Sequence, residues 1–345
     1  SKNANIARTC NYIFLKSSIV EKSVHIPRLG QHISTDSFAM SSLTSPSGKD
    51  CPFHQFLAIS FFIVPPLLLP PLRKLLNTPP PCPSPNLDHN SPVSSTVSSV
   101  LAAVSSCSKA LRSTTLAGAK AGSTNTSGDD QLSVDLLTDA LSFASLRSCD
   151  DVKFCISEET PTYVSANKGG TVAVSFDPLD GSSIMGPNFA VGGIYALWPV
   201  GSGEDDLQGR RGDEALASVV AVYGSRTTAF VSVKGRGCSE LTLTDGGWTV
   251  TRPKVEISSA AKIFAPGNLR ATKGHPGYKR AVDMWIAEGY TLRYTGGMVP
   301  DVCHILSKGG GVFSNVATEG AKQKLRFLYE VAAIALMVEE AGGLY

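Results

Sequence analysis

The hydrophobic and polar positions divide the chain into two unlike parts. Residues 1–96 show no sustained period, whereas from Val97 onwards apolar residues recur at helical or strand-like spacing. Helical spacing predicts helices over residues 97–112, 132–146, 215–223, 278–288, 301–308 and 322–340. Alternation and short apolar runs predict strands over residues 152–156, 171–176, 189–198, 227–234, 240–244, 247–251, 262–265, 291–294 and 311–315. Residues 118–128 read as a loop of small residues. These elements indicate an α/β fold in which helices cover a sheet.

The first 96 residues are rich in Ser and Pro, and we expect them to form a low-complexity, disordered extension. The apolar stretch 56–72 is cut by paired prolines, and each uninterrupted run is too short to span a bilayer, so we expect no membrane partner. An acid-poor, Ser-rich start is typical of an organelle transit peptide. Translated non-coding sequence, with the true start at Met40, is an equally good explanation.

Charge and cysteine content exclude several functions. The formal net charge is +2, and the part after residue 100 shows no basic stripe, so we expect no nucleic-acid partner. Eight cysteines are scattered without a Cys-x-x-Cys pair or a His at zinc spacing, so they read as reduced, structural thiols. Pairing of Cys149 with Cys155, which flank a predicted strand, is the alternative.

The most informative segment is 176–183, Phe-Asp-Pro-Leu-Asp-Gly-Ser-Ser. A strand-like run delivers Asp177 and Asp180, and a Gly-Ser-Ser turn comes next, whose N–H groups suit an anion. Carboxylates for a hard cation beside donors for a phosphate are the parts of a metal-dependent phosphatase. A surface Asp-Pro/Asp-Gly turn is the competing interpretation.

Further carboxylates favour the phosphatase. Glu158 and Glu159 follow another strand-like run, and ligands bind at the carboxyl ends of strands in open α/β sheets. Glu330 lies in a helical run dominated by apolar residues, where a lone charge is rarely buried unless it is paired or bound to metal. A solvated edge for the glutamate pair and an exposed helix face for Glu339 and Glu340 are the alternatives.

Four segments of the chain, 157–159, 176–183, 325–330 and 340–343, resemble the sugar bisphosphatases of the fructose-1,6-bisphosphatase class. Ile184 and the segments 266–271 and 292–301 are similar to the branch of that family that acts on sedoheptulose 1,7-bisphosphate. The resemblance runs from about residue 97 to Tyr345. It implies a layered α-β-α-β-α sandwich, with an N-terminal phosphatase domain over residues 97–252 and an incomplete C-terminal domain over 253–345.

The resemblance also implies a metal site. Family members hold two or three Mg²⁺, with Mn²⁺ as an alternative, through residues that match Glu158, Asp177, the carbonyl of Leu179, Asp180 and Glu330. Residues that match Glu159, Asp135 and Asp129 orient and activate water. Hydrolysis then needs in-line attack on phosphorus and no protein nucleophile.

The remaining implied contacts are with the substrate. Gly181, Ser182 and Ser183 match the cradle of the phosphate that is removed. The sugar and its distal phosphate match a second set: Asn268, Arg293, Tyr294 and Lys324. In the family the arginine matching Arg293 reaches the neighbouring subunit's site, which implies a homodimer or homotetramer.

The chain departs from plastid family members in one respect. Those carry a regulatory cysteine pair where Gly118 and Ser123 stand here, so thiol control by that pair is not expected. The missing pair favours the cytoplasm over a plastid. We therefore expect a Mg²⁺-dependent phosphatase that removes the 1-phosphate of sedoheptulose 1,7-bisphosphate, with fructose 1,6-bisphosphate as a further substrate. The alternatives are an inositol or nucleotide phosphatase of the same superfamily and a catalytically silent phosphosugar-binding protein.

Overall fold

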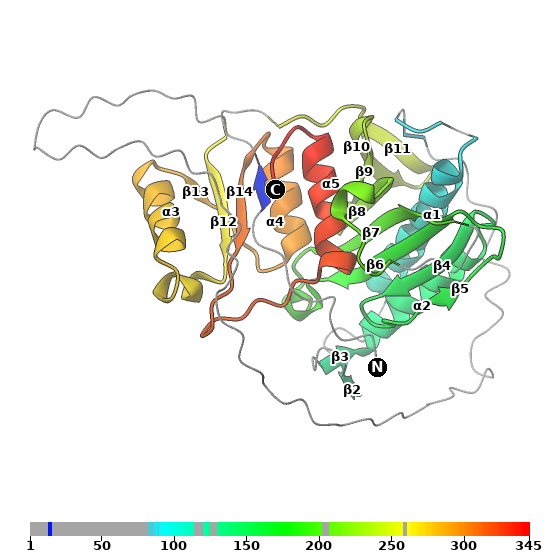
Figure 1. Cartoon of the computed structure of the whole chain (residues 1–345), viewed down its shortest axis with the longest axis horizontal. Helices are drawn as coiled ribbons and strands as arrows, with labels where there is room; N and C mark the ends of the chain where they lie inside the picture. Colours follow the sequence, from blue (N-terminus) through cyan, green and yellow to red (C-terminus); the bar gives the residue numbers. More distant parts are fainter. Residues whose placement is uncertain are drawn as a thin grey trace, which may run out of the picture. The chain divides into compact units, whose positions relative to one another are not determined.

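The two larger of three β-sheets alternate with three helical layers in the part of the chain that the computed structural model describes (Figure 1). The described residues are 13–15, 83–84, 86–88, 90–113, 120–124, 130–201, 207–257 and 261–345. They all fall within the compact unit formed by Ser1–Ser18 and Asn77–Tyr345. Most of the extension expected over residues 1–96 lies outside the described residues.

The elements follow one another in this order: β1 (Ile13–Leu15), α1 (Pro92–Ser113), β2 (Lys120–Thr124), β3 (Asp130–Leu132), α2 (Ser133–Arg147), β4 (Val152–Ser157), β5 (Val164–Ser165), β6 (Val172–Asp180), β7 (Val191–Pro199), β8 (Ala217–Tyr223), β9 (Thr227–Val233), β10 (Gly237–Thr244), β11 (Gly247–Arg252), β12 (Ile263–Gly267), α3 (Pro276–Ala287), β13 (Thr291–Leu292), α4 (Met298–Ser307), β14 (Gly311–Asn315) and α5 (Ala332–Glu340). The large sheet has eight strands in the order β11-β10-β9-β8-β7-β6-β4-β5, and the smaller one has the order β1-β14-β12-β13.

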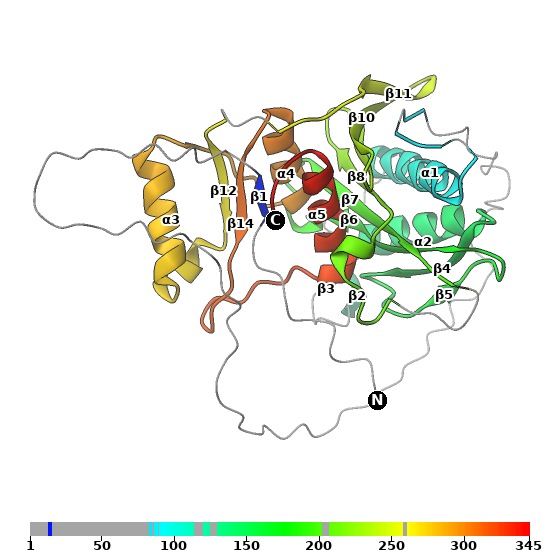
Figure 2. The same ribbon diagram turned by 45° about the horizontal axis from the view of Figure 1, so that its top comes forward.

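Three hydrophobic cores show how the layers stack. One core joins a face of the large sheet to α1 and α2, and a second joins its other face to α4 and α5. In the smaller sheet, Ala265 and Phe313 point into that second core, while Phe264 and Val312 point to α3. Neighbouring residues of a strand point to opposite faces, so each strand serves two cores. The layers are therefore α1/α2, large sheet, α4/α5, small sheet and α3, which confirms the expected α-β-α-β-α sandwich (Figure 2).

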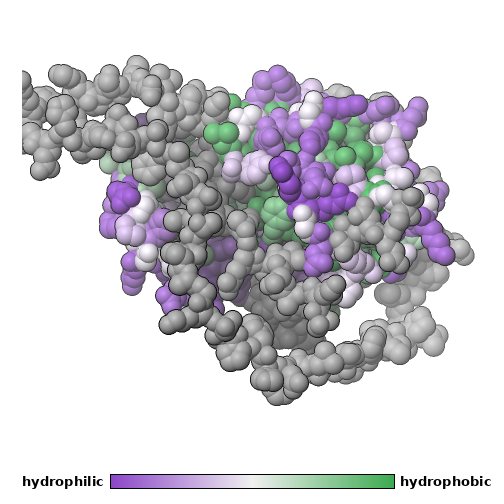
Figure 3. Space-filling model, in the orientation of Figure 1, coloured by the Kyte–Doolittle hydropathy of each residue, from purple (hydrophilic) through white to green (hydrophobic). Residues whose placement is uncertain are grey.

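Helix α5 is hydrophobic all round because it lies between the two sheets. Its residues Ala332 to Val338 are all buried, and most belong to the second core. A helix that is apolar on every side is stable only where both sides are covered. Helix α3 differs because only Tyr278, Val282 and Trp285 are buried, and its outer side is largely hydrophilic (Figure 3).

Two predicted helices differ from the structure. Residues 217–223 form strand β8, since the β-branched run Ser-Val-Val-Ala-Val is buried on both faces between β7 and β9. Such short apolar runs fit a buried strand or helix equally well from periodicity alone. The predicted helix 322–340 begins only at Phe327, with one π-helical turn, Phe327–Val331, that leads into α5.

The other predicted elements are confirmed, with ends shifted by up to five residues. The loop expected over residues 118–128 contains strand β2, which pairs with β3. In the smaller sheet, β1 pairs antiparallel with β14. The division of the phosphatase part into two domains after residue 252 remains a prediction. Within the described residues, no helix combines the length and apolarity that crossing a membrane requires.

The contact between β7 and α4 leaves no room for a side chain at Gly192. A Cβ there would lie 2.2 Å from the Cβ of Val299, in the first turn of α4. We expect Gly192→Ala to lower the free energy of unfolding by about 1–3 kcal/mol, because the helix must move away from the sheet. Urea denaturation measures this. Gly169→Ala is the control, since a Cβ there meets no atom within 4 Å, and equal stability of both variants would contradict the expectation.

Candidate metal centre

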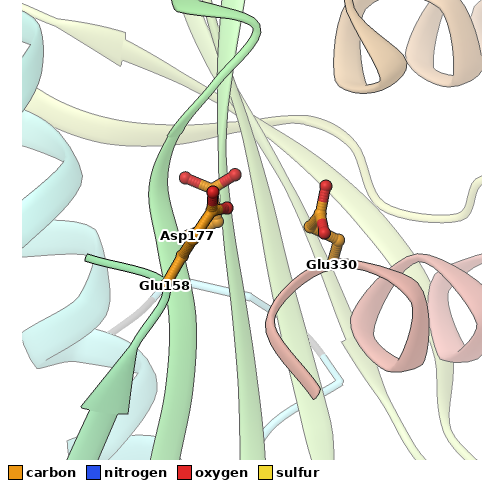
Figure 4. Close-up of side chains that lie close together, drawn as sticks. All are labelled: Glu158, Asp177 and Glu330. Atoms are coloured by element: carbon orange, nitrogen blue, oxygen red, sulfur yellow. The ribbon is translucent and has the colours of Figure 1, made fainter. Parts of the chain in front are cut away.

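The pairing of two parallel strands brings the first two carboxylates together. Strand β4 runs parallel to β6, and Ser157 is paired with Phe176. The next residues, Glu158 and Asp177, therefore lie beside one another where β4 ends (Figure 4). The N–H of Glu158 donates to the carbonyl of Phe176 at 3.0 Å, so the strand contact continues into the site.

The third carboxylate comes from the turn before α5. Glu330 lies in the π-helical turn, is 4% exposed, and points toward Glu158 and Asp177. One carboxylate oxygen from each of the three residues lies within 4.8 Å of the other two. Asp177 and Glu330 are buried and Glu158 is half-buried, and three acidic oxygens so close together repel one another unless a cation or protons lie between them. The structure thus brings together three of the five predicted metal ligands.

Arg326 supplies part of the balancing charge, and the sequence analysis missed it. Its guanidinium lies 2.5 Å from Glu158 and 3.9 Å from Glu330, and its backbone N–H donates to the Glu330 carboxylate at 2.5 Å. The only signal in the sequence was its spacing of four residues from Glu330. A single guanidinium leaves the cluster with an excess of negative charge.

Asp180, the fourth predicted ligand, caps helix α4. One of its carboxylate oxygens accepts the N–H of Val299 at 2.9 Å, which places a negative charge at the positive end of that helix. It lies outside the group of three, yet its charge raises the pKa of both Glu158 and Glu330, so it is near them. Its place as a ligand remains a prediction.

The backbone carbonyl of Leu179 is the fifth predicted ligand. Between Asp177 and Asp180 the pairing of β6 with β7 shifts by one residue, which marks a bulge. Pro178 has no N–H to donate there, and the Leu179 N–H donates to the Asp177 side chain at 2.9 Å. A bulge leaves a residue outside the regular ladder, which is where a carbonyl is available for a ligand.

Burial raises the pKa of every carboxylate in this cluster. It raises the pKa of Glu158 from 4.5 to about 7, with Arg326 opposing the rise, and that of Asp180 from 3.8 to about 6. The pKa values of Asp177 and Glu330 lie well above their ordinary range, because of burial first and the neighbouring carboxylates second. Without a cation, protons are the means by which this site lowers its charge.

Two of the predicted water-activating residues, Asp135 and Glu159, lie close to one another. Asp135 is buried in the first turn of α2, where it accepts the N–H of Leu132 at 2.9 Å. Burial raises its pKa to about 6, and Glu159 and Ser182 also act on it, so these three groups are close together. Asp129 lies outside the described residues. Asp139, one helical turn after Asp135 and also buried, was not identified from the sequence.

The predicted phosphate cradle is a tight turn. Gly181 has φ +82°, a conformation that favours glycine, and Ser182–Ile184 forms a single 3₁₀ turn. The turn packs against the loop before α4, since a Cβ at Gly181 would lie 3.3 Å from the Cα of Gly297. Asp301 holds that loop by accepting the N–H groups of Thr295 at 2.8 Å and Gly296 at 3.3 Å.

The four predicted sugar and distal-phosphate residues do not belong to the group of three carboxylates. The side-chain amide nitrogen of Asn268 donates to the carbonyls of Val316 and Ala321, at 2.7 and 2.9 Å, so it fixes a turn. Arg293 and Lys324 are exposed, and Tyr294 is half exposed. Their contact with a substrate remains a prediction.

The cysteines of the described residues are buried and unpaired. Cys149 and Cys155 are both free thiols, so the alternative of a disulfide between them is wrong for this structure. Burial raises the pKa of Cys155 to about 12, which keeps it protonated and unreactive. The interpretation of these thiols as structural is confirmed.

The fold and the carboxylate cluster define a layered α/β protein with a candidate metal centre, and comparison with known proteins identifies its family. The N-terminal domain of fructose-1-6-bisphosphatase matches residues 87–253, and its C-terminal domain matches residues 257–344. The chain belongs to the fructose-1,6-bisphosphatase family.

Several relatives support that assignment. The chain is 45% identical over 225 residues to the chloroplastic sedoheptulose-1,7-bisphosphatase of Triticum aestivum, which is 64% of this chain and 56% of that protein. It is 37% identical over 229 residues to the class 1 fructose-1,6-bisphosphatase of Syntrophotalea carbinolica, which is 65% of this chain and 69% of the relative. The chain thus spans just over half the length of the chloroplastic relatives that it matches.

Solved structures show the same fold. The holo form of Leishmania major fructose-1,6-bisphosphatase aligns with a TM-score of 0.68 at 27% identity, covering 76% of this chain and 87% of that one. A proposed sedoheptulose-1,7 bisphosphatase from Toxoplasma gondii aligns with a TM-score of 0.66 at 38% identity, covering 72% and 82%.

The raised pKa values predict how the metal-free protein responds to pH. Between the ordinary pKa near 4 and the raised values of about 6 to 7, the folded state binds more protons than the unfolded state. The free energy of unfolding therefore falls as pH rises from 5 to 7.5, by about 1 kcal/mol for each such group.

Denaturant unfolding at several pH values with a chelator present tests this. Mg²⁺ at pH 7.5 should restore the lost stability, since a cation replaces the protons. Glu330→Gln should make the pH dependence shallower and weaken the Mg²⁺ effect. A metal-free protein whose stability stays level or increases over this range would contradict the expectation.

Proposed function

We propose that the chain is a divalent-cation-dependent sugar bisphosphatase that removes the 1-phosphate of sedoheptulose 1,7-bisphosphate, with fructose 1,6-bisphosphate as a further substrate. One observation carries the proposal: Glu158, Asp177 and Glu330 come from three separate segments and place carboxylate oxygens within 4.8 Å of one another. Asp177 lies on β6 three residues before the Asp180-Gly181-Ser182-Ser183 turn, so a cation bound there would be near donors that suit a phosphate.

We propose Mg²⁺ as the cofactor, two or three ions for each site, with Mn²⁺ as a substitute. The donor set consists of carboxylate oxygens and a backbone carbonyl, which suits hard cations. Asp177, Glu158 and Glu330 would form its buried part, and Leu179 and Asp180 would complete it. When bound, such an ion polarises phosphoryl oxygens and acidifies water.

The chain's own residues would activate the water and orient the phosphate. Glu159 and Asp135 would hold and deprotonate the attacking water, together with Asp129. The contact of Ser182 with Asp135 supports this, since it ties the water-holding side to the phosphate turn. Gly181, Ser182 and Ser183 would orient the phosphate for in-line attack, and positioning of this kind supplies much of the rate. The leaving oxygen would receive its proton from water.

Substrate selection would depend on the four predicted sugar and distal-phosphate residues, Asn268, Arg293, Tyr294 and Lys324. Arg293 and Lys324 provide cationic donors for a distal phosphate, and an arginine donates in pairs. The half-exposed Tyr294 would pack against the sugar. The Asn268 amide nitrogen donates to the carbonyls of Val316 and Ala321, so this residue would position the turn beside the sugar.

Assembly and location belong to the same proposal. We propose a homodimer or homotetramer, because in the family the arginine that matches Arg293 serves a neighbouring subunit. A cytoplasmic location is favoured by the missing cysteine pair. The plastid alternative is favoured by the names of the chloroplastic relatives.

Removing one carboxylate from the cluster tests the mechanism. We expect Asp177→Asn to lower kcat by about 100-fold or more, because a buried cation ligand is lost. The metal-free variant should unfold at the same temperature as the parent or higher, since like-charge repulsion is relieved. Phosphate release from sedoheptulose 1,7-bisphosphate measures kcat, and chelator should abolish it.

Asp245→Asn is the matched control, because Asp245 is exposed at the turn between β10 and β11. Near-normal turnover of Asp177→Asn would overturn the proposed metal mechanism. Assays with fructose 1,6-bisphosphate and inositol monophosphate on the same preparation distinguish the sugar branch from the wider superfamily.

A second variant tests the distal-phosphate contact. We expect Arg293→Ala to raise KM for the bisphosphate about tenfold, which matches the loss of one charge-assisted hydrogen bond. The rate with a sugar monophosphate that lacks the distal phosphate should not change. Arg280→Ala, at an exposed position of α3, is the control. An equal effect of Arg293→Ala on both substrates would contradict the assignment.

A further inference from the structure

A short turn carries both glutamates of the site. After β4, the N–H of Ser157 donates to the carbonyl of Thr160 at 3.2 Å, and the N–H of Thr160 donates to the Ser157 hydroxyl at 2.9 Å. These two bonds close the turn around Glu158 and Glu159. They do not fix its direction relative to the helical layer beside it, and adjacent carboxylates repel one another.

Asp139 attaches this turn to helix α2. Its Oδ2 accepts a hydrogen bond from the Thr160 hydroxyl at 2.9 Å, and the side chain is 6% exposed. It also lies near the Ser157 side chain, so both ends of the turn meet the same carboxylate. Asp139 follows Asp135 by one helical turn and faces the same side of α2.

Stability alone gives a poor account of an aspartate at this place. The second oxygen of Asp139 is buried and has no hydrogen-bond partner, and burial opposes its charge. A neutral residue there would avoid this cost. What the carboxylate provides is a strong, fixed acceptor for the turn that holds the glutamates.

We propose that Asp139 and Thr160 are positioning residues that fix the acidic turn, so that Glu158 joins Asp177 and Glu330 and Glu159 faces Asp135. The inference rests on the proposed function, because it assigns the turn a metal-binding role. Neither residue touches the cation or the substrate. They act in the way that partners of metal ligands act in general, where their loss typically lowers metal affinity about 10- to 100-fold.

Mn²⁺ binding to the 345-residue chain, monitored by the loss of the free-ion EPR signal, tests the proposal without an activity assay. Thr160→Val removes the donor at nearly constant shape and should weaken Mn²⁺ binding about tenfold. Asp139→Ala should weaken it at least as much, because the Ser157 contact is lost as well, and the double variant should be no weaker than Asp139→Ala. Thr160→Ser and Asp139→Asn keep the donor and the acceptor and should restore affinity to within about threefold.

Thr242→Val is the control, since Thr242 is a buried threonine on β10 whose hydroxyl bonds only within that hairpin. Unchanged Mn²⁺ affinity in Thr160→Val, with parental protein that binds the ion, overturns the inference and leaves the proposed function intact. Affinity that falls in Thr160→Ser as much as in Thr160→Val also overturns it. Parental protein that binds no Mn²⁺ overturns the proposed function itself.

Discussion

Repulsion among buried carboxylates is the constraint on which the site depends. Glu158, Asp177 and Glu330 are held within 4.8 Å of one another, and Arg326 pairs with two of them, Glu158 and Glu330. Such a group is stable only if protons or a divalent cation offset its charge, so the same arrangement that destabilises the metal-free fold creates affinity for metal. The expected pH response, the proposed metal requirement and the proposed chemistry all result from the repulsion among these carboxylates.

The layered fold holds these carboxylates close together because they lie on firmly packed elements. Parallel pairing of β4 with β6 fixes two of the carboxylates, and α5, buried between two sheets, fixes the third. Helix α4 belongs to the same arrangement, because Asp180 caps its first turn and Asp301 in that turn holds the loop next to the phosphate turn. The start of α4 thus contacts both Asp180 and strand β7, where a Cβ at Gly192 would lie 2.2 Å from the Cβ of Val299.

Much of the fold and part of the site could be predicted from the sequence. The α/β layering was evident from periodicity, and the family motifs implied the sandwich. Residues 215–223 were assigned wrongly because a short β-branched run has no period that separates a buried strand from a buried helix. Residues 322–326 were included in a helix because they adjoin a strongly apolar helical run, whereas the helical turn begins at Phe327. Boundaries depend on tertiary contacts that periodicity does not contain.

The sequence by itself determined the chemical groups: which carboxylates exist, that two strands deliver them, and that a Gly-Ser-Ser turn lies directly after Asp180. These are local properties of residue type and spacing. Only the tertiary structure decided which of them meet. It grouped Glu158 with Asp177 and Glu330, assigned one oxygen of Asp180 to a helix end, and revealed Arg326, Asp139 and Asp301 as partners. Such contacts join residues that are far apart in the chain, and the packing of layers, rather than any local pattern, sets their distances.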